Sequence, residues 1–385
     1  MSAIVGHRSP ERPGTLKVMI PTGDDVLTAL RGVIDPDLRR DIVTLNFVKE
    51  ARVDEGGAAF ATIELTTPAC PVKDELKAEA ERLVAAIPGV TSVRIEMTAQ
   101  VRQRSAPAAD LVPNVKHIVA IASGKGGVGK STVAVNLAVA LAQTGARVGI
   151  LDGDVYGPSV PLMLGAADER PLQQDEKIVP ILRYGVDVMS IGFLLEEGQA
   201  VLWRGPMVAG TVRQLLADVA WGELDYLLVD LPPGTGDAPM SLAQLVPLTG
   251  VVVVSTPHNV AANIAGKAVA LFRRLNAPIL GVVENMGPSV DPRTGETVRT
   301  FAGMPGTDLA LQLKVPYLGS VPFDPGVSAA GDEGYPAVLA HPDTDQARAF
   351  REIAGTLARQ CSIKAMTRQD LTQVGTAPPR VGAPV

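Results

Sequence analysis

The segment SGKGGVGKST, from Ser123 to Thr132, matches the pattern G-x-x-x-x-G-K-[ST] at every fixed position. Glycines let such a backbone curl so that successive N–H groups point at phosphate oxygens, and the final lysine reaches the β- and γ-phosphates. The apolar run HIVAIAS (His117–Ser123) before it is typical of a buried strand, and STVAVNLAVALAQTG (Ser131–Gly145) after it is typical of a helix. A glycine-rich turn without a ligand would not need this context, so the sequence predicts a phosphate-binding loop.

The residues expected to contact a nucleotide are consecutive along this loop. They are Gly124, Lys125, Gly126, Gly127, Val128, Gly129, Lys130, Ser131 and Thr132. Lys130 is the expected phosphate ligand, and the Ser131 hydroxyl is expected to hold Mg²⁺. A second lysine, Lys125, is not required by the ordinary pattern and calls for a separate explanation.

Apolar segments alternate with helical segments from Val115 onward. The segments ARVGILDGD, LDYLLVDLP, GVVVVSTP and PILGVVENM are apolar enough to be strands buried on both faces. This order predicts an α/β fold, a doubly wound and mostly parallel sheet between two helical layers. The ligand is then expected at the carboxyl ends of the strands.

A smaller domain is expected before this sheet. Helical spacing in DDVLTALRGVID, alternation in AAFATIELTT and an amphipathic helix in VKDELKAEAERLVAAIPG predict a small α+β domain over residues 19–102. Residues 1–18 and 363–385 are expected to be tails, the second one disordered, and the Ala- and Pro-rich residues 103–114 a linker. The P-loop ATPase domain is then expected over residues 115–362.

Composition limits the classes of function. The 385 residues are 46% hydrophobic and 20% charged, which suits a globular protein with a large core, and the net charge of −6 gives no indication of a nucleic-acid partner. Neither a signal peptide nor a stretch long enough to span a membrane is recognisable. The two cysteines, Cys70 and Cys361, are far apart and predict no disulfide framework, so a cytoplasmic protein is expected.

Acidic residues follow two of the apolar segments. Asp230 ends LDYLLVD, and this is the pattern of a carboxylate that holds Mg²⁺, usually through water, opposite the Ser131 hydroxyl. Asp152 and Asp154 follow ARVGIL, and one of them is a candidate to orient an attacking water. The alternative is that these aspartates only cap helices or turns.

Several longer blocks carry a resemblance to a known family. The segments KGGVGKST, LDGDVYGPSVPLML, LLVDLPPGTGD, VVENM and LGSVPFDP resemble the Mrp/ApbC iron–sulfur cluster carriers, which are deviant Walker A ATPases. The first domain, with LTTPACP (Leu65–Pro71), resembles a small domain of iron–sulfur assembly factors.

This resemblance implies roles for particular residues. It implies that Lys125 reaches across a two-fold homodimer to the nucleotide of the other subunit, as an arginine finger does, while Lys130 acts within its own subunit. It further implies that Asp154 orients water, that Asp230 lies on the Mg²⁺ side and that Asn285 hydrogen-bonds the adenine. An Asn after a strand also commonly makes only a turn, so this reading of Asn285 stays open.

The sequence departs from the family where a cluster would be bound. Many members carry C-x-x-C shortly after ENM, and two copies can hold a cluster between subunits, whereas Glu284–Gly303 contains no cysteine here. Cys70, in TTPACP and just before an expected helix, is the remaining candidate ligand, with a small buried cysteine as the alternative. Cys361 and the four histidines show no metal-binding pattern.

The resemblance implies an ATPase that uses Mg²⁺ and ATP and carries an iron–sulfur cluster to apoprotein clients. Two other functions stay open. One is a positioning ATPase of the MinD/ParA kind, against which the C-terminal segment argues because it has neither an amphipathic face nor a basic run. The other is an ATP-dependent adaptor that holds no cluster of its own.

Overall fold

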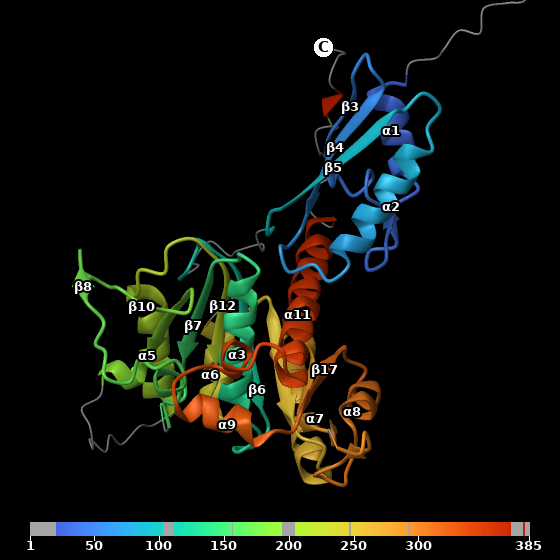
Figure 1. Cartoon of the computed structure of the whole chain (residues 1–385). Coiled ribbons are helices and arrows are strands. Elements are labelled where there is room, and N and C mark those ends of the chain that lie inside the picture. The colour runs from blue at the N-terminus through green and yellow to red at the C-terminus, as the bar shows by residue number, and fades with distance from the viewer. Residues whose placement is uncertain are drawn as a thin grey trace, which may run out of the picture. The chain divides into compact units, whose positions relative to one another are not determined.

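The computed structural model describes residues 21–102, 111–155, 157–194, 205–245, 248–291, 293–370 and 380–381 (Figure 1). The expected tail at 1–18 and most of the expected linker lie outside these residues. Two compact units make up the chain: Met1–Glu64, Asp74–Thr98 and Thr376–Val385 form the first, and Leu65–Lys73 and Ala99–Gly375 form the second.

The first unit is a small α+β domain. Its sheet has the order β18-β3-β4-β5, and its other elements are two helices and a short hairpin. The bounds are α1 (Gly23–Leu30), β1 (Ile34–Asp35), β2 (Arg40–Asp41), β3 (Val48–Val53), β4 (Ala58–Leu65), α2 (Lys73–Ala85), β5 (Ser92–Ala99) and β18 (Arg380–Val381). Thr22 caps α1 by accepting a hydrogen bond from the Asp25 amide. Alternate residues of β4 are buried, as the sequence pattern predicts for a sheet covered on one face.

The second unit is built on an eight-stranded sheet. Every neighbouring pair is parallel except the edge pair β10 and β11. In spatial order the strands are β10 (Ile181–Arg183), β11 (Val186–Ser190), β7 (Val148–Asp152), β12 (Leu224–Asp230), β6 (Val115–Ser123), β13 (Gly250–Ser255), β14 (Ile279–Gly287) and β17 (Tyr317–Pro322).

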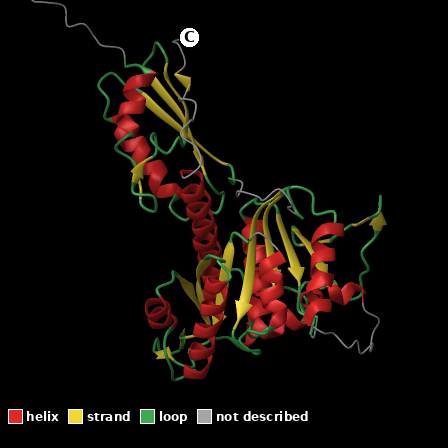
Figure 2. Ribbon diagram, turned by 180° about the vertical axis from the view of Figure 1, so that it is seen from behind, coloured by secondary structure: helices red, strands yellow, loops and turns green. Residues whose placement is uncertain are grey.

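Helices cover both faces of this sheet (Figure 2). One layer contains α3 (Lys130–Gln143), α4 (Val160–Met163), α9 (Pro325–Asp332), α10 (Ala337–Ala340) and α11 (Asp345–Asp370). The other contains α5 (Gly205–Asp218), α6 (Asp237–Leu245), α7 (Asn259–Arg274) and α8 (Gly306–Leu313). The short elements outside the layers are η1 (Ile191–Leu194) and two hairpins, β8 (Gln173–Gln174) with β9 (Lys177–Ile178) and β15 (Ser289–Val290) with β16 (Thr297–Val298).

The core of the second unit follows from its apolar strands. Every residue of β7, β12 and β13 is buried, because helices lie on both sides of the sheet. The predicted fold class, a doubly wound and mostly parallel sheet preceded by a small α+β domain, is therefore confirmed.

The C-terminal helix is longer than expected. The sequence predicted a disordered tail from residue 363, but α11 continues to Asp370. Ala365 and Met366 are buried, so this last part of the helix has an apolar face that packing stabilises. Farther along, Arg380–Val381 pairs with β3 in parallel.

The segment Leu65–Lys73, which contains the LTTPACP motif, belongs to the second unit. The Thr67 Oγ1 atom lies 3.0 Å from the Tyr226 hydroxyl, and both side chains are buried. Gly355 of α11 lies against the same segment, since a Cβ at that position would be 3.1 Å from the Ala69 carbonyl oxygen. The motif is therefore anchored to β12 and α11.

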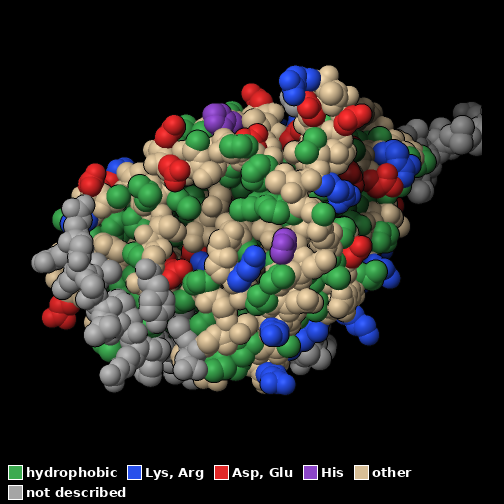
Figure 3. Space-filling view, turned by 90° about the horizontal axis from the view of Figure 1, so that it is seen from below, with side chains coloured by type: hydrophobic (Ala, Val, Ile, Leu, Met, Phe, Trp, Pro, Cys, Tyr) green, Lys and Arg blue, Asp and Glu red, His purple; other side chains and the backbone are tan. Residues whose placement is uncertain are grey.

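Among the described residues, no helix is both long and apolar enough to cross a bilayer. Figure 3 shows one face of the molecule, on which Lys and Arg side chains appear as separate spots among apolar, acidic and other atoms. The described part of that face carries no continuous basic patch of the kind that tracks a nucleic-acid backbone.

Candidate nucleotide site

The loop between β6 and α3 lies at the carboxyl edge of the sheet. Gly129 precedes α3 and adopts a left-handed backbone with φ +76°. A Cβ there would lie 2.2 Å from the Asn285 side-chain nitrogen, so only glycine fits. Lys130 is the first residue of α3, and the helix N-terminus adds positive partial charge to the loop.

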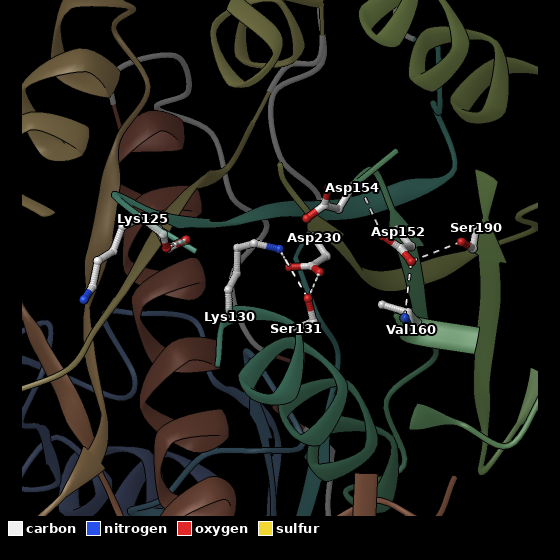
Figure 4. A network of polar contacts seen from close by, with 9 residues as sticks. Lys125, Lys130, Ser131, Asp152, Asp154, Val160, Ser190 and Asp230 are labelled. Atoms are coloured by element: carbon white, nitrogen blue, oxygen red, sulfur yellow. Dashed lines mark hydrogen bonds and ion pairs between the residues drawn. The ribbon is translucent and has the colours of Figure 1, made fainter. Parts of the chain in front are cut away.

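Three predicted residues meet at this edge (Figure 4). The Lys130 Nζ atom lies 2.6 Å from Asp230 Oδ1, and the Ser131 hydroxyl donates to Asp230 Oδ2 over 2.5 Å. Lys130 is 6% exposed and Asp230 is completely buried. The carboxylate at the end of β12 therefore binds both residues that the sequence assigned to phosphate and metal.

A second carboxylate, Asp152, lies at the same edge in register with Asp230. Its Oδ1 atom accepts from the Asp154 amide at 3.1 Å, and its Oδ2 atom accepts from the Val160 amide and the Ser190 hydroxyl. Burial, and then the nearby Asp230 carboxylate, raise the pKa of Asp152 to about 7. Asp152 therefore organises the loop that carries Asp154.

Two cavities adjoin the loop. One of about 200 Å³ is lined by loop residues together with Asp154, Ser159, Met163 and Pro233. The other, of about 570 Å³, has a mostly apolar lining that includes Asn285, Val321, Pro322 and Phe323. Gly129 and Thr132 line both cavities, so the two are neighbouring parts of one site.

A bulge sets the position of Asn285. The pairing of β14 with β17 shifts between Glu284 and Gly287, and Met286 has φ +57°. The Asn285 Nδ2 atom donates to the Val128 carbonyl oxygen over 2.9 Å. Asn285 therefore closes the loop from the side of the apolar cavity.

Lys125 differs from the other loop residues. It lines the smaller cavity, but its side chain points away from Lys130 and Asp230 (Figure 4). The two lysines line the same cavity, but their side chains point in different directions.

The predicted metal ligands divide into two cases. Ser131 and Asp230 offer hard oxygen atoms next to each other, which is the donor chemistry that Mg²⁺ prefers, so they fit this ion. Cys70 is partly exposed, and α2 begins at Lys73 as expected, whereas Cys361 is buried. Within the described residues no group of three or more His, Cys, Asp or Glu is placed to hold a metal. The strands β15 and β16 lie in the cysteine-free segment Glu284–Gly303.

Sequence reasoning missed one wall of the site. Residues of α9 line the apolar cavity: Val327, Ser328, Ala329 and Asp332. The block LGSVPFDP ends at Pro325, the first residue of this helix, and was the available signal. The residues of α9 that follow this block have no chemically distinctive pattern. The cavity that they line could therefore be recognised only from the structure.

A strand, a phosphate loop and a helix, with Lys130 and Ser131 bound to an aspartate on the neighbouring strand, define a P-loop NTPase. The sequence model of a family described as NUBPL iron-transfer P-loop NTPase matches residues 114–358, and a model of the iron–sulfur cluster assembly protein family matches residues 23–97. The chain belongs to the iron-transfer P-loop NTPase family, which confirms the resemblance seen in the sequence.

Individual relatives cover most of the chain. A protein named iron-sulfur cluster carrier protein from Deinococcus radiodurans is 48% identical over 89% of this chain and 97% of its own length. A protein of the same name from Synechocystis is 44% identical over 90% and 99%. A solved nucleotide-binding protein from Archaeoglobus fulgidus, in complex with ADP, is 39% identical and covers 62% of this chain and 93% of its own, with a TM-score of 0.54.

Proposed function

We propose that this chain is a Mg²⁺-dependent ATP hydrolase that carries iron–sulfur clusters and delivers them to apoproteins. The arrangement of Lys130, Ser131 and Asp230 beside two joined cavities carries the nucleotide part of the proposal. The names of the relatives from Deinococcus radiodurans and Synechocystis support the carrier part.

The two cavities suit the two ends of ATP. The smaller one, with the loop amides and Lys130, would take the phosphates. The larger apolar one would take the base. The Asn285 amide nitrogen is used by Val128, so its amide oxygen is the group that would accept from an adenine amino group.

Hydrolysis requires the ion pair at the loop to open. Lys130 would leave Asp230 to bind the phosphates, and Ser131 and Asp230 would then hold the metal. Bound Mg²⁺ would supply positive charge against the β- and γ-phosphates. Asp154, in the wall of the same cavity, would orient the attacking water.

Lys125 is proposed to act on the partner of a homodimer. Its side chain points away from its own Lys130, which suits a cation directed toward a second subunit. A lysine supplied in this way stabilises transition-state charge and makes hydrolysis depend on dimer geometry. Turnover is expected to be slow, and it should depend on dimer formation because each site would be complete only in the dimer.

The cluster is treated as cargo, with Cys70 as its proposed ligand. A homodimer supplies two copies of Cys70, whereas a cluster usually takes four thiolates. Clients or small thiols would have to complete the set, so the cargo should be held weakly. The cysteine-free segment after Asn285 favours one further candidate, an adaptor that uses ATP to set its own shape and binds clients without holding a cluster.

Two measurements test the proposal. The first is phosphate release from ATP and from GTP, with Mg²⁺ and with the metal chelated. We expect slow Mg²⁺-dependent turnover that prefers ATP, and turnover at background would contradict the hydrolase. The second is anaerobic reconstitution with iron and sulfide, followed by transfer to an apo-ferredoxin. Turnover without any cluster or transfer would favour the adaptor. A separate assay tests the positioning ATPase: ATP-dependent binding to liposomes or DNA would favour that alternative.

A further inference from the structure

The walls of the two cavities come from different helices of the same layer. Met163 of α4, with Ser159 just before it, lines the phosphate cavity. Residues of α9 line the apolar cavity. A contact between α4 and α9 therefore joins the proposed base site to the proposed phosphate site.

These helices meet through two glycines, Gly165 after α4 and Gly334 after α9. A Cβ at Gly334 would lie 2.6 Å from the Gly165 Cα atom, and a Cβ at Gly165 would lie 3.0 Å from the Gly334 carbonyl oxygen. Both have left-handed backbones, with φ +62° and +73°. The Tyr184 hydroxyl also donates to the Gly334 carbonyl oxygen over 2.9 Å. The contact is between the backbones of the two glycines. A displacement of one helix therefore cannot be absorbed by a flexible side chain at this point.

The other end of α4 is tied to the loop after β7 that carries Asp154. The amide of Val160, its first residue, donates to Asp152 Oδ2 at 3.3 Å. The same carboxylate accepts from the Asp154 amide at 3.1 Å. A shift of α9 would therefore be transmitted to Asp154 through the glycine contact, α4 and Asp152.

We propose that Gly165 and Gly334 are positioning residues that couple a base in the apolar cavity to the placement of Asp154. The inference rests on the proposed ATP hydrolysis and deepens it. A base against α9 holds the glycine contact in the arrangement that aims Asp154 at its water. A misplacement of about 1 Å in such a group costs on the order of a hundredfold in rate.

Gly165→Ala tests this with a close control. Gly222 has the same φ of +62°, but a Cβ there would have no neighbour within 4 Å. Gly222→Ala therefore also places an alanine at a positive φ, but without touching another element. We expect Gly165→Ala to lower kcat for ATP by about tenfold or more relative to Gly222→Ala, with KM and the affinity for a fluorescent ADP changed less than about threefold.

A second readout separates coupling from general damage. Inorganic tripolyphosphate supplies the phosphates without a base. The native protein should have a higher kcat for ATP than for tripolyphosphate, and Gly165→Ala should reduce this ratio. Tyr184→Phe, which removes one bond to Gly334 and adds no atom, should lower kcat in the same direction if Gly165→Ala does not fold.

The outcomes are distinct. If the native protein turns over ATP and Gly165→Ala and Tyr184→Phe both match Gly222→Ala, the coupling is wrong and the proposed function stands. A parallel loss of ADP affinity and kcat in a folded Gly165→Ala would also overturn it, because the contact would then only shape the cavity. A native protein without turnover would overturn both proposals.

Discussion

Lys130 Nζ and Asp230 Oδ1 are 2.6 Å apart, and both side chains are buried. Neither partner is easily removed alone, because the other would stay as an uncompensated charge away from water. The pair therefore holds a buried positive charge at the phosphate loop.

Replacing this cation tests the phosphate site. Lys130→Ala should lower ATP turnover by on the order of a hundredfold or more, because a fixed positive charge at the transferring phosphate is lost. It should also lower the free energy of unfolding by a few kcal/mol, on the order of the cost of breaking a buried pair. Phosphate release and urea unfolding measure the two effects. Lys77→Ala removes an exposed lysine with only a surface partner and is the control. A folded Lys130→Ala protein with near-native turnover would rule out this site.

The direction of Lys125 in Figure 4 leads to a complementation experiment. Lys125→Ala should keep more nucleotide binding than Lys130→Ala but lose hydrolysis. Subunits with Lys125→Ala, mixed with Asp154→Ala subunits, should recover part of the activity. One site of the mixed dimer then has its own Asp154 and the partner's Lys125. No recovery, with mixed dimers shown to form, would mean that Lys125 acts within its own chain.

Asn285 should determine base preference. Asn285→Ala removes the proposed acceptor for the adenine amino group and the bond to Val128. We expect ATP affinity to fall by about tenfold, and the preference for ATP over GTP to shrink. Competition against a fluorescent nucleotide measures both. Asn114→Ala, at an exposed position, is the control. An unchanged ATP-to-GTP ratio would place the base elsewhere.

The pKa of Asp152 predicts a pH dependence of stability. The pKa of this carboxyl is raised from its ordinary value of 3.8, expected in the unfolded chain, to about 7 in the folded protein. Between these pH values the folded state holds more protons than the unfolded state, so raising the pH lowers the free energy of unfolding, by on the order of a few kcal/mol in all. Asp152→Asn should weaken this slope between pH 5 and 8 in urea unfolding without nucleotide. The exposed Asp168→Asn should leave it unchanged. Equal slopes in all three proteins would mean that Asp152 is ionised throughout.

Cys70 and Cys361 form a natural pair of test and control. Low iron as purified and a weak, air-sensitive reconstitution are expected. Cys70→Ser should abolish the reconstituted absorbance and iron content while ATP turnover remains. Cys361→Ser should change neither, because burial raises the pKa of that thiol and keeps it from solvent. A stable, stoichiometric cluster in Cys70→Ser would show that other residues are its ligands.

Much of the fold could be predicted from the sequence, because the patterns that indicate it are local. The loop from Gly124 to Ser131 has a fixed spacing, and strands such as Leu224–Asp230 are apolar throughout. The meeting of Lys130, Ser131 and Asp230 also followed, since carboxyl ends of parallel strands share an edge.

Features that depend on tertiary contacts could not be predicted from local sequence patterns. The burial of Asp152, which raises its pKa, depends on what packs around the end of β7. The extension of α11 to Asp370 depends on what buries Ala365 and Met366. The contact between Gly165 and Gly334 joins residues far apart in the chain, and neither glycine has a local pattern that distinguishes it from a turn.

The hydrogen bond between Thr67 and Tyr226 limits how the chain can be divided into independent domains. A chain truncated to start at Val115 would keep nearly all of the P-loop family match but would lose Leu65–Lys73. The buried Tyr226 hydroxyl would then lack Thr67, at a cost of about 1–3 kcal/mol if no water replaces it. A chimera that exchanged the first domain at the linker would likewise replace packing that belongs to the second unit. The boundary between two recognisable sequence families is thus a poor place to cut this polypeptide.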